Sequence, residues 1–328
     1  MKRALILGIN GQDGSYLADL LLAKGYEVHG LYRRSSVDNL WRIRHLDGKV
    51  TLHQGDLSDG ASVENVIAKV MPDEIYNEAD QDSVGWSHVS PDYQYDVTFR
   101  AVGRLLEFVK QTKTRIFQPC TAMMFGDAAK SPQPAPQDEG TPFNPQSPYA
   151  VAKVAAYYAC RHYREQHGVY VSCGILYNHD SPRRSEHYLL HKTCNAAVRI
   201  ASGKQETLSL GNLDGRVDVG FAGDYMEAAW LALQQPKPDD YVVATGQAWS
   251  VEEMVAEAFE QAGVRPVWTC ADGSPRITKD AAFWKPGAPS ILRGDASKAN
   301  KVLGWKAKHC IKDLIAMLIA DAKAKEQA

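Results

Sequence analysis

Residues 4–14 read Ala4-Leu5-Ile6-Leu7-Gly8-Ile9-Asn10-Gly11-Gln12-Asp13-Gly14, and this stretch decides the fold class. Its first four residues are apolar and predict a buried strand, and the GxxGxxG glycines predict a tight turn that opens a helix. Glycines let the backbone approach a pyrophosphate, and a helix N-terminus supplies amide groups and the positive end of a dipole. We therefore expect the turn to bind the diphosphate of a dinucleotide through Gly8, Asn10, Gly11, Gln12, Asp13 and Gly14.

Short apolar runs alternate with helical patterns through the first two-thirds of the chain. Strands are expected at 4–7, 27–32, 50–54, 74–76, 116–118 and 169–175, with amphipathic helices such as 15–24, 61–70 and 98–110 between them. This alternation predicts an α/β fold with a Rossmann-type, doubly wound parallel sheet. The alternation loosens after about residue 179, which predicts a smaller mixed α/β C-terminal lobe over the carboxyl edge of the sheet.

The cofactor is indicated by the residues after the second predicted strand, Tyr32-Arg33-Arg34-Ser35-Ser36. An NAD enzyme usually carries a carboxylate there, which binds the ribose 2′-hydroxyl. Guanidinium groups and hydroxyls suit a phosphate better, so we expect NADP, bound by Arg33, Arg34 and Ser35. A solvated basic loop is the alternative. Asp56 and Leu57, after the third predicted strand, are expected to touch the adenine ring, with an ordinary acidic turn as the alternative.

A tyrosine and a lysine lie four residues apart in Ser147-Pro148-Tyr149-Ala150-Val151-Ala152-Lys153. On a helix the two side chains share one face. The ammonium favours the ionised phenol, so Tyr149 is expected to act as a base nearer neutral pH than its usual pKa of about 10 allows. A base beside a nicotinamide is what alcohol–ketone hydride chemistry requires, so Tyr149 and Lys153 are the predicted catalytic pair. A plain amphipathic helix is the alternative interpretation.

Composition sets limits on the class of protein. The 328 residues suffice for one large domain or two modest ones, and a hydrophobic content of 45% with 23% charged residues is ordinary for a soluble globular protein. The net charge of −2 gives no indication of a nucleic-acid or membrane partner. Six scattered cysteines lack metal-binding spacing, so we expect reduced thiols in the cytoplasm and no metal site.

Several motifs together resemble one family. They are the glycine turn, Arg33-Arg34-Ser35-Ser36, the Tyr149/Lys153 pair, Asn178-His179-Asp180-Ser181-Pro182-Arg183-Arg184 and Gly211-Asn212-Leu213-Asp214. The chain is similar, from Ala4 to the Leu303-Gly304-Trp305 run, to the GDP-mannose 4,6-dehydratases, which are extended short-chain dehydrogenase/reductases acting on nucleotide sugars. The resemblance implies an NADP-binding Rossmann domain at 1–178. It also implies a discontinuous nucleotide-sugar-binding lobe at 179–328, some segments of which return to the first domain.

The resemblance also implies a reaction and a set of site residues. Tyr149 would remove the proton of the sugar C4 hydroxyl while the C4 hydride passes to NADP. Thr121 would bind the same sugar oxygen, and Lys153 would hold the nicotinamide ribose. Arg216 or Lys192 would replace a diphosphate-binding arginine whose position Val217 occupies. The further substrate contacts would come from Asp82, Ala122, Met123, Asn178 and Arg184.

Two segments depart from the family pattern. Cys120-Thr121-Ala122-Met123-Met124-Phe125-Gly126 stands where the family has Ser-Thr-Ser-Glu-Met-Phe-Gly, so Met123 replaces the glutamate that acts as acid and base in water elimination. Asn77-Glu78-Ala79-Asp80-Gln81-Asp82-Ser83-Val84-Gly85 stands where the family has roughly Asn-Leu-Ala-Ala-Gln-Ser-His-Val-Gly. Asp80 or Asp82 could stand in for the missing acid. The alternatives are a pocket reshaped for another sugar, acids turned to solvent, and weakened cofactor binding.

We therefore expect an NADP-dependent enzyme that oxidises C4 of a nucleotide-linked hexose, with a GDP-hexose favoured. The loss of the glutamate argues against 4,6-dehydration and leaves 4-epimerisation or 4-ketosugar reduction open. A non-catalytic relative that binds NADP or a nucleotide sugar is the alternative from another class. A homodimer through the Tyr149 helix, or a homotetramer, is expected from the resemblance.

Overall fold

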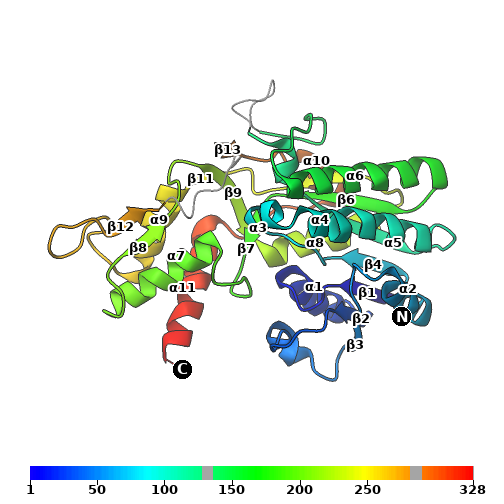
Figure 1. Cartoon of the computed structure of the whole chain (residues 1–328), viewed down its shortest axis with the longest axis horizontal. Coiled ribbons are helices and arrows are strands. Elements are labelled where there is room, and N and C mark those ends of the chain that lie inside the picture. The colour runs from blue at the N-terminus through cyan, green and yellow to red at the C-terminus, as the bar shows by residue number, and fades with distance from the viewer. Residues whose placement is uncertain (128–135, 281–289, 328) are drawn as a thin grey trace.

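A parallel sheet organises the first part of the chain in the computed structural model, which describes residues 1–127, 136–280 and 290–327 (Figure 1). Within these residues, every neighbouring pair of its seven strands is parallel. The order reverses between β1 and β4, the position at which doubly wound sheets bind dinucleotides, and the predicted Rossmann-type fold is confirmed. Across the sheet the strands are β3 (Thr51–Gln54), β2 (Glu27–Tyr32), β1 (Arg3–Leu7), β4 (Glu74–Asn77), β5 (Arg115–Thr121), β6 (Val171–Leu176) and β10 (Asp240–Val243).

Helices cover both faces of this sheet, so most strand residues outside the edge strand β3 are buried. On one face α1 (Gln12–Ala23) packs against α8 (Ala222–Gln234), and α10 (Ser297–Leu303) packs on α8. On the other face α5 (Ala101–Val109) lies between α2 (Gly60–Val70) and α6 (Pro148–His167). Shorter helical segments connect these layers, namely η1 (Trp41–Leu46), α3 (Val84–Val89), α4 (Pro91–Tyr95), η2 (Asp96–Arg100) and η3 (Ala122–Phe125).

A second lobe carries its own hydrophobic core, built from α7 (Leu189–Ala201), α9 (Val251–Ala262) and α11 (Ile311–Gln327). Its central strand β9 (Arg216–Phe221) pairs with β7 (Asn178–Asp180), β11 (Ala248–Ser250) and β13 (Ile291–Leu292). A further pair joins β8 (Leu208–Leu210) to β12 (Ile277–Lys279). Figure 1 shows this lobe beside the sheet, with β7 between the two parts.

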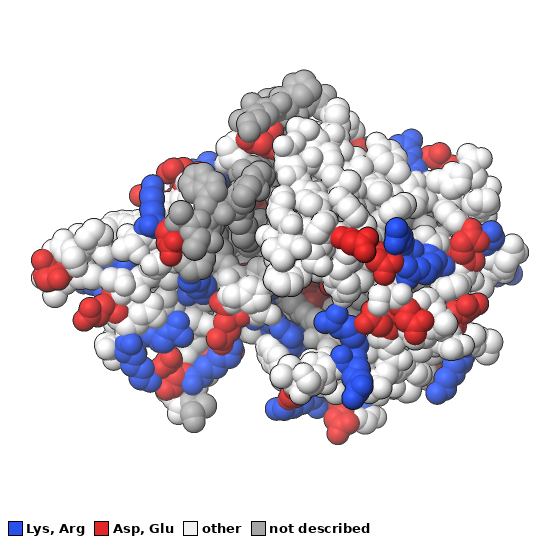
Figure 2. Space-filling view, in the orientation of Figure 1, with Lys and Arg blue, Asp and Glu red and all other residues white. Residues whose placement is uncertain are grey.

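The segments α8, β10 and α10 lie on the first sheet although they follow residue 178 in the sequence. The indole of Trp305 is buried in the same core and donates to the Asp224 carbonyl at 2.7 Å. On the face shown in Figure 2, basic and acidic side chains are interspersed. Among the described residues, no helix is long and apolar enough to cross a membrane.

Local departures from the expected elements have physical causes. The helix expected at 98–110 begins instead as the wider π-turn η2 and continues as α5. The strand expected at 116–118 extends to Thr121, because its partner β6 continues to Leu176 and pairs with it residue by residue. Single π-turns within helices are frequent at functional sites, and this one carries Thr98 toward the active-site loop described below.

Candidate active site

The Tyr149–Lys153 pair lies on α6, as the spacing predicts. Ser147 caps the helix by accepting a hydrogen bond from the Ala150 amide at 3.2 Å, and Pro148 occupies the first turn, where no amide donor is needed. Both functional side chains point inward, with 8% of Tyr149 and 4% of Lys153 exposed. The Lys153 Nζ lies 5.8 Å from the centre of the Tyr149 ring. The structure therefore brings the phenol and the ammonium together.

Lys153 is held by two acceptors of the protein. Its Nζ donates to the Pro119 carbonyl at 2.8 Å and pairs with the Asp80 carboxylate at 2.7 Å. Pro119 belongs to β5, and Asp80 lies in the loop between β4 and α3. Burial opposes the ammonium, but Asp80, Tyr149 and Cys120 together outweigh it and raise the pKa of Lys153. Lys153 is thus a permanent cation whose charge is matched by a nearby anion.

The surroundings of Tyr149 oppose the activation expected from Lys153. Burial raises the pKa of Tyr149 to about 12, because removing the phenolate from water costs more than Lys153 returns. Lys153 and a hydrogen bond with Thr121 lower this pKa, whereas the negative charges of Asp80 and Asp82 raise it. At neutral pH Tyr149 is consequently a phenol, able to donate a proton.

The residues of the predicted sugar-facing turn follow directly on β5. The Thr121 hydroxyl accepts a hydrogen bond from the Met123 amide at 3.2 Å and caps η3. Ala122 is buried, and the half-buried Met123 packs against the hydrophobic core of the sheet domain. A thioether has no proton to transfer. Met123 therefore contributes packing and no acid or base.

The glycine turn closes tightly over the end of β1. Gly8 adopts a φ of +79°, and a Cβ there would lie 2.9 Å from the backbone of Ala79. A Cβ on Gly14 would lie 2.4 Å from the Gly8 carbonyl oxygen. Gly11 caps α1 and donates its amide to the Gly8 carbonyl at 2.9 Å. The turn has no room for a side chain at Gly8 or Gly14. A backbone turn of this kind fits the pyrophosphate of a dinucleotide.

The second half of the turn binds the run 178–184. Asp13 pairs with His179 at 3.0 Å, and the Ser181 hydroxyl donates to Gln12 at 2.8 Å. Burial opposes both charges of the first pair, but each stabilises the other, which lowers the pKa of Asp13 and raises that of His179. His179 and Ser181 were not among the predicted site residues. Through these contacts His179 and Ser181 hold the second half of the glycine turn in place. In the first half of the turn, Asn10 donates to the Asn39 carbonyl at 3.0 Å.

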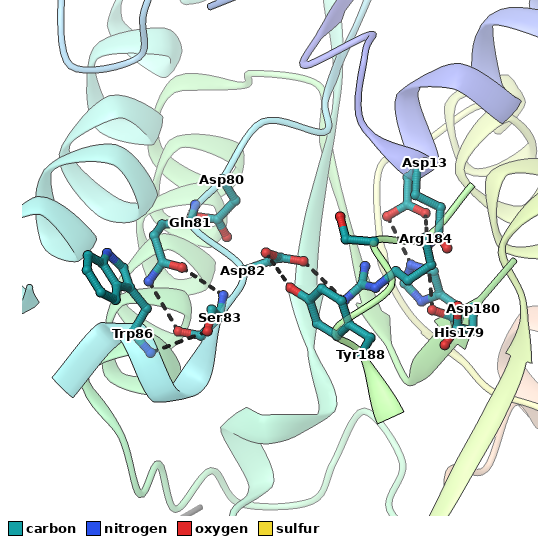
Figure 3. A network of polar contacts seen from close by, with 12 residues as sticks. Asp13, Asp80, Gln81, Asp82, Ser83, Trp86, His179, Asp180, Arg184 and Tyr188 are labelled. Carbon is teal, nitrogen blue, oxygen red and sulfur yellow. Dashed lines mark hydrogen bonds and ion pairs between the residues drawn. The ribbon is translucent and has the colours of Figure 1, made fainter. Parts of the chain in front are cut away.

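Arg184 joins the two lobes. Its guanidinium pairs with Asp82 at 3.1 Å and lies 3.6 Å from the centre of the Tyr188 ring, and the Tyr188 hydroxyl donates to Asp82 at 2.9 Å. Figure 3 shows Asp82 reaching from the Asp80 loop to this pair. Asp82 is therefore an ion-pair partner of Arg184, which is a poor arrangement for a proton donor.

The predicted adenosine contacts lie in two turns at the same edge of the sheet. Arg33, Arg34 and Ser35 follow β2 on an exposed loop, and Arg33 donates to the Tyr93 hydroxyl at 2.7 Å. Asp56 follows β3 and accepts from the Ser58 amide at 2.9 Å, so its carboxylate shapes the turn. The side chain of Leu57 is buried.

Three predicted substrate contacts lie in the second lobe. Arg216 pairs with Glu253 at 3.0 Å at the start of α9. Lys192 donates to the Ser209 carbonyl at 2.8 Å. Asn178 begins β7 and is exposed. These partners lie outside the Tyr149 cluster, so the role of the three residues in binding a substrate stays a prediction.

Two other features bear on the chemistry. A cavity of about 480 Å³ lies between the end of β10 and α10, lined by Thr245, Arg293 and Trp305 among others, and none of its lining residues belongs to the Tyr149 cluster. Within the described part of the chain, no group of three or more His, Cys, Asp and Glu side chains could hold a metal ion.

Comparisons with known proteins agree with this arrangement. A family model described as GDP-mannose 4,6 dehydratase matches residues 5–318. GDP-mannose 4,6 dehydratase 1 from Arabidopsis thaliana is 43% identical over 332 residues, which cover 97% of this chain and 89% of that protein.

Solved structures with this fold include the UDP-glucose 4-epimerase of Thermus thermophilus in complex with NAD, at a TM-score of 0.83 and 24% identity, covering 98% of this chain and 99% of that one. RMD from Pseudomonas aeruginosa complexed with NADPH matches at a TM-score of 0.81 and 20% identity, and the match covers 99% of this chain and 100% of that one. At these identities the two structures support the fold, whereas the family model and the curated relative establish kinship. The chain belongs to the GDP-mannose 4,6-dehydratase family.

Proposed function

We propose that this protein is an NADP-dependent enzyme that exchanges hydride between the nicotinamide and C4 of a nucleotide-linked hexose, with a GDP-hexose as the favoured substrate. The observation that carries the proposal is the cluster of Thr121, Tyr149 and Lys153 at the carboxyl end of the sheet. Membership of a family named for GDP-mannose dehydration supports the substrate class.

Each residue of the cluster has a definite task in this proposal. Tyr149 exchanges a proton with the oxygen on C4, as base in oxidation and as acid in reduction. Thr121 binds the same oxygen and orients it toward the phenol. Lys153 carries the positive charge that stabilises the phenolate once it forms, and it presents its remaining N–H to the nicotinamide ribose. The bound nicotinamide supplies the hydride acceptor or donor.

NADP in preference to NAD rests on the loop that follows β2. Arg33 and Arg34 offer guanidinium groups that can bind a 2′-phosphate through paired hydrogen bonds. The loop is exposed, and Arg33 donates to the Tyr93 hydroxyl, a contact that a bound phosphate could replace. Measuring the dissociation constants of NADP and NAD by nicotinamide fluorescence tests the preference, and equal constants would end it.

Met123 favours a reaction without water elimination. Elimination requires a group that takes the C5 proton and returns one to the departing C6 hydroxyl. Met123 packs against the core and has no such proton, and Asp82 is paired with Arg184. A 4-epimerase or a 4-ketosugar reductase needs only the Tyr149 cluster. These two activities are therefore the second candidate, beside 4,6-dehydration. A non-catalytic binder is the third, and it gives no reason to retain Thr121, Tyr149 and Lys153 together.

One experiment separates the candidates. GDP-mannose and NADP are incubated with the protein in deuterated water, and the sugar is analysed by mass spectrometry and NMR. An altered C4 centre without loss of water supports the epimerase or reductase form, and a 4-keto-6-deoxy product labelled at C5 supports the dehydratase form. No change at C4 with any nucleotide hexose and NADP, or with a nucleotide 4-ketosugar and NADPH, together with tight cofactor binding, would leave only the binder.

Self-association through α6 is also proposed, together with a cytoplasmic location. The outer face of α6 exposes 44% of Val151 and 53% of Tyr158, and Phe99 nearby is 38% exposed. Apolar side chains of this size on one helix face favour a partner surface, and a second copy of the chain can supply it symmetrically. Light scattering should give a dimer or tetramer, whereas Tyr158→Asp should give a monomer.

A further inference from the structure

The Lys153 ammonium is engaged by two acceptors of the protein itself. An ammonium has three N–H donors, and here one binds the Pro119 carbonyl while another faces the Asp80 carboxylate. The side chains of Lys153 and Asp80 are 5% and 12% exposed, so solvent screens their interaction little. The family pattern has alanine in place of Asp80. This chain therefore carries a counter-ion for its catalytic lysine.

A buried polar network fixes Asp80 in this position. One carboxylate oxygen accepts hydrogen bonds from the Gln81 amide, at 2.7 Å, and from the Thr98 hydroxyl. Gln94 donates to Thr98 at 2.6 Å, and both of these side chains are almost fully buried. Gln81 donates in turn to Gln94 at 2.5 Å. Figure 3 shows Asp80 and Gln81 in this loop, which continues to Asp82 and the Arg184 pair.

Because every member of this network has a partner, Asp80 has little freedom to turn away from Lys153. A satisfied buried network is rigid, whereas an acid merely placed in a surface loop would turn to water. The π-turn η2 contributes by carrying Thr98 into the network. The network is thus a built support for the carboxylate.

Building on the proposed function, we propose that Asp80 is a positioning residue that offsets the charge of Lys153 and, together with burial, keeps Tyr149 protonated, so that the site works as a proton donor toward a nucleotide-linked 4-ketosugar. In this step the C4 carbonyl carbon accepts hydride from reduced nicotinamide, and the carbonyl oxygen takes the Tyr149 proton. The ketone is reduced to the alcohol and the nicotinamide is oxidised. Solvent then returns a proton to the phenolate.

The charges around Tyr149 support this direction. Lys153 faces it from its own helix, Asp80 and Asp82 from the loop after β4, and Thr121 from the end of β5. Beyond these lie Glu78 and Cys120, which are near Lys153, and Tyr188, which is near Asp82 and Tyr149. The Asp80 and Asp82 carboxylates thus raise the Tyr149 pKa, and the Lys153 ammonium lowers it. Burial raises the pKa of Tyr149 to about 12, and the carboxylates add to the increase.

Titration of the phenol in the cofactor-free protein tests the proposal without requiring turnover. The ultraviolet tyrosinate signal is recorded against pH for the wild type and for Asp80→Asn. From each signal we subtract that of the same protein carrying Tyr149→Phe, which leaves the titration of Tyr149. Asparagine keeps the acceptor for Gln81 and Thr98 and removes only the charge. An opposite charge near a titrating group commonly shifts its pKa by about 1–3 units, so the Asp80→Asn midpoint should fall by at least about one unit.

The matched control is Asp47→Asn, which removes the same charge from an exposed position at the end of η1. Its Tyr149 midpoint should equal that of the wild type. An unchanged midpoint in Asp80→Asn would overturn the proposal, as would an equal shift in the control. Should Asp80→Asn fail to fold, carbon-13 NMR of the tyrosine ring carbons settles the matter in the wild type, because a Tyr149 midpoint below about pH 10 would contradict it.

Activity provides a separate outcome. With a 4-ketosugar nucleotide and NADPH, the wild-type rate should be constant near neutral pH and should fall only in alkali, and Asp80→Asn should move that fall to lower pH. Absence of any sugar turnover would defeat the proposed function and leave the phenol titration valid. Turnover with the same pH profile in both proteins would defeat the role of Asp80 alone.

Discussion

Met123→Glu should create or accelerate water elimination, because it places at position 123 a carboxyl group that can exchange protons. Met123 is half-buried at the second position of η3, directly after the Thr121 cap and against the wall of the site. A carboxyl group there would be partly desolvated, which raises its pKa toward neutrality and suits it to exchange protons. The matched control is Met123→Gln, which has the same length and polarity and no transferable proton.

The size of the effect follows from general acid–base catalysis, which typically contributes about 10²–10⁴ in rate, or roughly 2.7–5.4 kcal/mol of barrier. Tyr149, with a pKa of about 12, is ionised in about one molecule in ten thousand at pH 8, four pH units below its midpoint. When C4 oxidation is a reversible step that precedes a slower elimination, this low fraction lowers the elimination rates of both variants by the same factor. The ratio of their elimination rates should therefore still reach about a hundredfold or more.

The assay follows GDP-mannose with NADP by mass spectrometry, scoring loss of water and incorporation of deuterium from solvent at C5. Melting temperatures of both variants show whether the glutamate disturbs packing against the core. The reasoning is refuted if Met123→Glu eliminates water no faster than Met123→Gln, or if the wild type already does so at a comparable rate.

Further predictions concern the remaining parts of the site. Tyr149→Phe should lower hydride transfer by about 10²–10⁴ and leave the dissociation constant of NADP unchanged; parallel loss of binding would show that the tyrosine acts structurally. Gly14→Ala should abolish dinucleotide binding in a fluorescence titration, because its Cβ would meet the Gly8 carbonyl at 2.4 Å; retained affinity would contradict the cradle. Glu78→Gln should gain stability over the wild type as pH rises. Burial raises the pKa of Glu78 to about 8 from 4.5, so the folded state holds a proton that the unfolded state has released, and wild-type stability falls between these pH values. Urea unfolding at pH 5 and pH 9 measures this, and an equal difference at both pH values would count against it.

Much of the sheet domain could be predicted from the chain because its signals are local. The GxxGxxG turn, the apolar runs and the Tyr149/Lys153 spacing each depend on residues within a few positions of one another. Such patterns specify strands, turns and helix faces directly. The glycine turn and the Tyr149/Lys153 pair consequently lie on the elements that the sequence predicts.

The protonation state of the site could not be predicted, because it depends on contacts between distant segments. The local argument from Lys153 to an ionised Tyr149 was wrong, since burial and the carboxylate of Asp80, far away in sequence, outweigh it. The support that His179 gives to Asp13 joins residues equally far apart. The one available signal was the entry of carboxylates into the loop after β4, where the family pattern has none at these positions.

The central claim, that this cluster exchanges hydride with C4 of a nucleotide sugar, is tested most directly by an isotope at that carbon. Excess enzyme loaded with NADP is mixed with GDP-hexose carrying deuterium or hydrogen at C4, at alkaline pH, and the absorbance of reduced nicotinamide is followed through a single turnover. The account predicts a transient rise in absorbance that is slower for the deuterated sugar and absent in Tyr149→Phe. Tight binding of both cofactor and sugar with no reduced nicotinamide, or a rise that is the same for both isotopes and persists in Tyr149→Phe, would contradict it.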